Sequence, residues 1–141
     1  MTINTPILWV VLPIFIGAVT AVFYRRKILS VVLTSITGFG LGALAINFPE
    51  DLVISIGPMT FNFIESLGIL GRQINISFQF FPFIALIYFA TGLWAVGSTG
   101  SSVPDSFRPI SLIISALLTA SLGVEPFLYA ALFIEAAVLF S

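Results

Sequence analysis

Apolar residues fall into five runs that are separated by charged and turn-forming residues. The runs cover about residues 6–24, 28–48, 80–96, 110–122 and 126–141. A helix needs about 20 residues to cross the roughly 30 Å hydrocarbon core of a bilayer. The pattern therefore predicts an all-α membrane protein that forms a single membrane domain with about five transmembrane helices.

Residues 49–78 differ from the rest of the chain because charged residues and glycines are spread through them. This segment is expected to be an extramembrane loop between the second and third helices. Within it, Ile74, Ile76 and Phe78 alternate with polar residues, and a period of two is typical of a β-strand. We therefore expect a strand or a β-hairpin at the membrane surface.

The basic residues predict the orientation. Three of the five, Arg25, Arg26 and Lys27, lie between the first and second runs. Because cytoplasmic loops are enriched in Lys and Arg, we expect this loop in the cytoplasm and the N-terminus outside. Alternation then places the 49–78 loop and the turn near residue 125 outside, and the loop at residues 98–108 in the cytoplasm. The charges follow the first run rather than precede it, which predicts a retained helix and not a signal peptide.

The composition supports a membrane location and narrows the possible chemistry. Of 141 residues, 59% are hydrophobic and only 8% are charged, against roughly 25% charged residues in soluble domains. A net charge of −1 gives no basic field that would attract nucleic acid. With no Cys and no His, the usual soft-metal ligands are absent, and we expect no cofactor in this chain and no enzyme that acts alone. Proton chemistry is left to carboxylates.

Glu135 is the one ionisable residue that we expect deep in the membrane. It follows Pro126 by nine residues, or roughly 13 Å along a helix, which is close to the midplane of the bilayer core. A charged carboxylate there costs about 2.5 kcal/mol or more, so it must face a bundle interior or water, or carry a proton. Two interpretations stay open: a proton relay, or a buried acid that is hydrogen-bonded to a neighbouring helix.

Hydroxyl groups in the third and fourth predicted helices offer a weaker signal. Tyr88, Thr91, Ser115 and Thr119 can support a water chain, although such residues more often form interhelical hydrogen bonds. Asp105, which precedes the fourth run, is expected to help cap that helix or to be a solvated loop charge. The remaining acidic residues are expected to be solvated loop charges.

Gly38 and Gly42 have the Gly-x-x-x-Gly spacing that lets two helices approach closely. We interpret them as packing residues. A small structural membrane subunit that binds partners through this Gly-rich helix is therefore an alternative to an ion-translocating protein. A stand-alone transporter is disfavoured because the five runs contain no inverted repeat.

Four stretches of the chain resemble the beginning of the antiporter-like subunits of respiratory complex I, multisubunit cation/proton antiporters and membrane-bound hydrogenases. They are ILWVVLPIFIGAVTAVFYRRK, LGILGRQINISFQF, FRPISLIISALLTASLG and, above all, FLYAALFIEAAVLFS. In this family a membrane-buried Glu on the fifth helix pairs with a lysine in a proton-translocating half-channel. The resemblance implies that Glu135 is that residue and acts as a proton relay.

The resemblance also implies partners and a location. The chain would be the N-terminal portion of a longer or split subunit, and the intramembrane lysine would come from another chain or segment. The whole complex would be an NADH-quinone oxidoreductase or a relative, with its redox centres and quinone in other subunits. Its place would be a bacterial plasma membrane, or an inner or thylakoid membrane of an organelle. Whether protons or sodium ions move, and which electron donor drives them, stays open.

Overall fold

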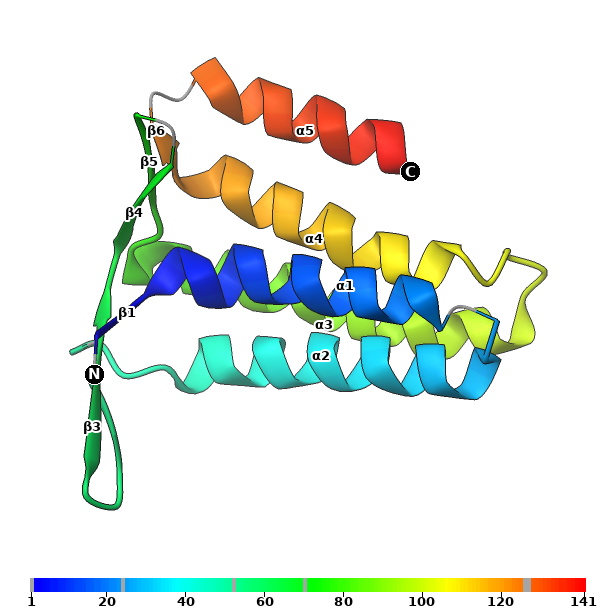
Figure 1. Cartoon of the computed structure of the whole chain (residues 1–141), viewed down its shortest axis with the longest axis horizontal. Coiled ribbons are helices and arrows are strands. Elements are labelled where there is room, and N and C mark those ends of the chain that lie inside the picture. The colour runs from blue at the N-terminus through cyan, green and yellow to red at the C-terminus, as the bar shows by residue number, and fades with distance from the viewer. Residues whose placement is uncertain (1, 24, 52, 70, 126–127) are drawn as a thin grey trace.

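Within residues 2–23, 25–51, 53–69, 71–125 and 128–141, which the computed structural model describes, five α-helices lie side by side. Small β-sheets cover one end of this bundle (Figure 1). In the same view α5 and α2 lie at opposite edges, with α4, α1 and α3 between them. The described residues are mostly helical, as predicted, but they form more strands than the one expected hairpin.

The helices begin and end close to the apolar runs. A π-helical turn, η1, continues directly into α1, and short 3-10 turns, η2 and η3, flank α3. Residue 24 and residues 126–127, at the ends of two of the predicted helices, lie outside the described residues. The bounds are Ile7–Val11 for η1, Leu12–Val22 for α1, Lys27–Asn47 for α2, Phe78–Phe80 for η2, Phe81–Gly97 for α3, Ser98–Gly100 for η3, Phe107–Gly123 for α4 and Leu128–Phe140 for α5.

Two helical stretches of the described residues are long and apolar enough to cross a membrane. They are Lys27–Asn47, with 21 residues, and Phe78–Gly100, with 23. The stretches Ile7–Val22, Phe107–Gly123 and Tyr129–Phe140 are apolar but shorter, at 10–17 residues each. At 1.5 Å per residue even 17 residues span only about 26 Å, which is less than a bilayer core. The described residues thus contain five apolar helices, and two of the helical stretches have the length of a membrane span.

The segment between α2 and α3 forms two hairpins, and each gains a third strand from elsewhere in the chain. The hairpin of β4 and β5 confirms the prediction for this loop, although the strand ends at Asn75 and the alternation beyond it continues into η2. The first sheet has the order β1-β3-β2, with β1 parallel to β3, and the second has the order β4-β5-β6. The bounds are Thr2–Asn4 for β1, Val53–Ile56 for β2, Met59–Ile64 for β3, Ser66–Ile69 for β4, Arg72–Asn75 for β5 and Val124–Glu125 for β6.

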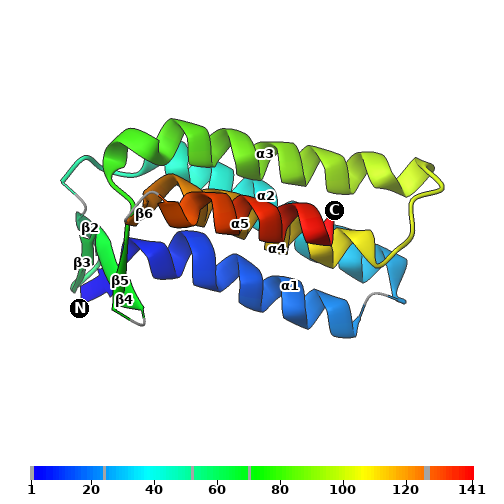
Figure 2. The ribbon, with the colours of Figure 1, turned by 90° about the horizontal axis from the view of Figure 1, so that it is seen from above.

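The two ends of the bundle differ in character. The N-terminus, the sheets and the junction of α4 with α5 lie at one end (Figures 1 and 2). The loop with Arg25 and Arg26 and the connection between α3 and α4 lie at the other end. This grouping agrees with the alternation inferred from the five apolar runs.

Aromatic rings join the bundle to the sheet layer. Trp9 and Phe81 are fully buried and their ring centroids are 5.5 Å apart, in edge-to-face geometry. Phe48, just after α2, packs edge-to-face against both, at 6.0 Å from Trp9 and 5.2 Å from Phe81. Phe63 of β3 extends the cluster at 4.9 Å from Phe48. These contacts fix the start of η1, the end of α2 and the start of α3 against one strand.

Gly38 lets α2 touch the backbone of α3. A Cβ atom at Gly38 would lie 2.7 Å from the backbone nitrogen of Gly92 and 2.8 Å from the carbonyl oxygen of Tyr88. At Gly42 a Cβ would lie 3.0 Å from the ring of Phe89. The predicted packing role of Gly38 and Gly42 is therefore confirmed, and their partner is a helix of the same chain.

Gly38→Ala is expected to destabilise the fold by about 1–3 kcal/mol, because the methyl group would overlap the backbone of α3. Gly40→Ala is the matched control, since a Cβ there meets nothing within 4 Å. It should be neutral or slightly stabilising because Ala favours a helix over Gly. Thermal unfolding in detergent micelles, followed by circular dichroism, compares the two. Equal transition temperatures would contradict the close packing at Gly38.

Candidate functional site

One side of α5 packs on the bundle. Ala130 and Ala137 are buried, and Phe133 between them is half-buried. This spacing of three and four residues marks the face that meets α4, the helix with which α5 makes most of its contacts. Small alanines at the contact let the two helices approach closely.

Glu135 lies on the other side of α5 and is exposed on the surface of the chain. It shares a hollow with Ile134, Val138 and Leu139, all of them exposed apolar residues. The side chain of Leu139 is 87% exposed. The face around Glu135 is thus apolar apart from its carboxylate, and it points away from the interior of this bundle.

Among the described residues, no hydrogen bond or ion pair reaches the Glu135 carboxylate. Glu135 follows Leu128, the first residue of α5, by seven positions, or roughly 10 Å of a helix about 20 Å long, so it lies midway. The basic residues lie at the two ends of the bundle. Arg72 contacts Tyr129 near the start of α5 at the sheet end, and Lys27 and Arg108 lie at the opposite end. Any cation at the depth of Glu135 must come from beyond the described residues.

The hydroxyl groups of α3 and α4 form a polar seam between these helices. Thr91 and Ser115 share a hydrogen bond of 2.5 Å, and the Tyr88 hydroxyl donates to the backbone carbonyl of Trp9. Thr119 donates to the carbonyl of Ser115 within its own helix. The prediction of interhelical hydrogen bonds is confirmed for Thr91 and Ser115, and also for Tyr88, which joins α3 to the π-helical turn η1.

A groove of about 430 Å³ opens over this seam. Its walls are mostly apolar, and Thr91, Ser111 and Ser115 contribute hydroxyls to its lining. Each of these hydroxyls already bonds a group of the protein. The seam therefore serves first to hold α3 against α4.

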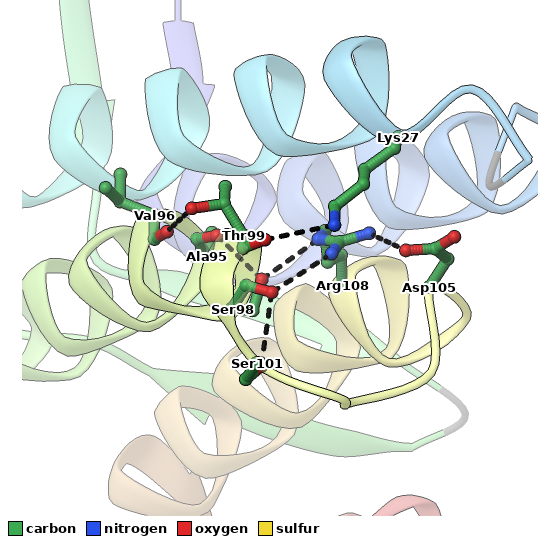
Figure 3. A network of polar contacts seen from close by, with 8 residues as sticks. All are labelled: Lys27, Ala95, Val96, Ser98, Thr99, Ser101, Asp105 and Arg108. Carbon is green, nitrogen blue, oxygen red and sulfur yellow. Dashed lines mark hydrogen bonds and ion pairs between the residues drawn. The ribbon is translucent and has the colours of Figure 1, made fainter.

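Arg108 was expected at the end of the loop at residues 98–108, but it lies in the first turn of α4. Its side chain is only 1% exposed, which the sequence did not predict. Its Nε donates to Ser98 Oγ at 2.9 Å, and its Nη2 donates to the Ser98 carbonyl at 3.3 Å (Figure 3). Its Nη1 pairs with Asp105 Oδ1 at 2.5 Å. A buried guanidinium is tolerated here because several acceptors face it.

Asp105 and Lys27 complete this network. The predicted cap at Asp105 is wrong, because Ser106 holds the N-cap position of α4 without a side-chain hydrogen bond, and Asp105 pairs with Arg108 instead. Lys27 Nζ donates to the carbonyl of Thr99 at 3.0 Å (Figure 3). The start of α2 and the start of α4 are thus both tied to the turn that ends α3.

The described residues contain no group of three or more acidic, His or Cys side chains that could hold a metal ion. Comparisons with protein families, with curated proteins and with solved structures gave no match for this chain. Its function must therefore be argued from its own residues.

Arg108→Gln is expected to destabilise the fold by about 1.5–3 kcal/mol, the range for hydrogen bonds to a charged group. The loss follows because Ser98 and Asp105 lose their shared partner. Arg26→Gln, an exposed arginine at the same end, is the matched control and should change little. Unfolding in micelles and protease cleavage within residues 98–106 measure the effect. Equal cleavage of both variants would show that Arg108 does not hold the connection.

Proposed function

We propose that this chain is the N-terminal membrane portion of a proton-translocating, antiporter-like subunit, and that Glu135 carries protons in it. The subunit would belong to a complex related to complex I or to a cation/proton antiporter, in which electron transport drives the movement of protons. The observation that supports the proposal best is a carboxylate midway along the apolar outer face of α5.

A membrane location is the first step. The apolar stretches Lys27–Asn47 and Phe78–Gly100 have the length of a membrane span, and the shorter apolar helices lie beside them (Figure 2). Large apolar side chains such as Phe15, Ile36 and Leu86 are more than 60% exposed around the bundle. A surface of this kind suits lipid or a partner helix better than water. By the positive-inside rule, the end with Arg25 and Arg26 would be cytoplasmic.

In the proposed subunit, a partner helix would cover the outer face of α5. An ionised carboxylate that faces lipid at that depth costs about 2.5–3.5 kcal/mol. A neighbouring helix that brings a lysine to Glu135 offsets this cost. The open apolar face with Leu132, Val138 and Leu139 offers such a helix a surface to pack against.

The alternative is a structural membrane subunit in which Glu135 only anchors a partner through a hydrogen bond. The sequence suggested that such a subunit binds its partner through the Gly-rich α2. This version loses support because Gly38 and Gly42 already pack on α3. The structural role would then also use the outer face of α5. The two hypotheses therefore share a surface and differ in whether protons pass through it.

Glu135→Gln in the assembled complex separates them. The amide keeps the size and a hydrogen bond but cannot give up a proton, so a relay should lose proton pumping by about tenfold or more. Glu50→Gln, an exposed glutamate outside the helices, is the matched control and should pump like the parent. Pumping is measured in inverted membrane vesicles with a pH-sensitive dye, and assembly by native gel electrophoresis. Normal pumping in a normally assembled Glu135→Gln complex would exclude the relay.

A further inference from the structure

A second apolar space, partly open to the surface, lies at the sheet end of the bundle, away from Glu135. It has a volume of about 360 Å³ and lies between η1, α1, the second sheet and α5. Val10, Ile14, Ile74 and Phe133 contribute to its apolar walls. The volume and the apolar lining fall in the range of sites for small apolar ligands.

Arg72 is the charged residue of this lining. Its side chain is exposed, its guanidinium lies 4.4 Å from the centroid of the Tyr129 ring, and its Nη2 donates to the Tyr129 hydroxyl at 2.6 Å. That bond uses one of the five N–H donors of a guanidinium. No ion pair to Arg72 is found among the side chains that the structure describes, which do not include that of Glu125.

Arg72 lies at the end of the bundle and not along its helices. It belongs to β5, in the sheet layer that covers the end of the bundle (Figure 1). If the apolar helices lie in the bilayer core, this layer lies at the level of the headgroups. The space then extends from a cation at headgroup level into the apolar region between α1 and α5. This is the shape and polarity of an anionic amphiphile.

We propose that this space binds a phospholipid, with part of an acyl chain between α1 and α5 and with its phosphate on Arg72. A guanidinium suits a phosphate because its planar fork gives two parallel hydrogen bonds, and stacking on Tyr129 holds the fork in place. The bound lipid fills the gap beside the first turns of α5 and stabilises that helix against α1. The inference rests on the membrane location in the proposed function but not on any role of Glu135.

Native mass spectrometry of the purified chain in detergent tests the site, with dioleoyl phosphatidylglycerol as the probe. Arg72→Gln should weaken its binding by at least about tenfold, because a charge-assisted hydrogen bond is lost. Arg26→Gln removes an arginine at the opposite end and should bind like the parent. Dioleoylglycerol, which has the same chains without the phosphate, should bind the parent as weakly as phosphatidylglycerol binds Arg72→Gln. Glycerol phosphate, which lacks the chains, should not bind.

Two further variants separate the lipid site from a structural role of Arg72. Tyr129→Phe removes the hydrogen bond from Arg72 but keeps the ring, and should retain binding within about twofold. Val11→Trp fills the space from its rim, where Val11 is 44% exposed, and should abolish binding with Arg72 in place. This variant and the two lipids decide the question even if Arg72→Gln fails to fold.

Several results would overturn the proposal. They are equal binding by the parent and Arg72→Gln, equal affinity for the two lipids, retained binding in Val11→Trp, or no lipid retained by the parent. Glu135→Gln should bind phosphatidylglycerol normally while it loses pumping. Failure of one proposal is therefore visible independently of the other.

Discussion

The packing of α4 in the middle of the bundle is the interaction on which the other features depend. This helix contacts all four of the others, as well as η1 and β5. It can do so because small residues occupy its contact faces, and Ala116 and Ala120 are fully buried. The Ser115 hydroxyl bonds Thr91 of α3, and the Thr119 hydroxyl bonds the carbonyl of Ser115. A helix with large side chains at these positions would hold its neighbours further away. Arg108 then anchors the first turn of α4 to the end of α3.

The central place of α4 leaves α5 at the edge. Beyond α4, the contacts of α5 within the chain include β6 and the pair of Arg72 with Tyr129. Since Ala130 and Ala137 occupy the face toward α4, the helical period places Glu135 on the outside. The same arrangement leaves the apolar space between α1 and α5 at the sheet end. Both proposals thus arise from one geometric cause: among the described residues, the rest of the chain covers α5 on one side only.

The sequence predicted the helices because long apolar runs with clear breaks have few other interpretations. It also predicted the β4–β5 hairpin from alternation, but not β1, whose three residues carry no periodic signal and pair with β3 some 60 residues away. The burial of Arg108 was not predicted because it depends on acceptors of Ser98, ten residues earlier, and no local pattern reveals them. For Glu135 the pattern gave the helix and the depth. It could not give the direction of the side chain, because the residues of α5 are apolar on every face of the helix. The helix therefore has no distinct polar face.

The positions of the polar groups also limit how protons could move. The hydroxyls of the seam between α3 and α4 are bonded to one another or to carbonyls, and none of the residues that line its groove also lines the hollow around Glu135. Within the described residues, Glu135 therefore has no chain of hydrogen-bonding groups leading to it. A relay through Glu135 would receive and release its protons through the partner that covers α5, and through water held between them. The partner would then supply both the counter-charge and the path, so the outer face of α5, rather than the interior of this bundle, is where translocation would take place.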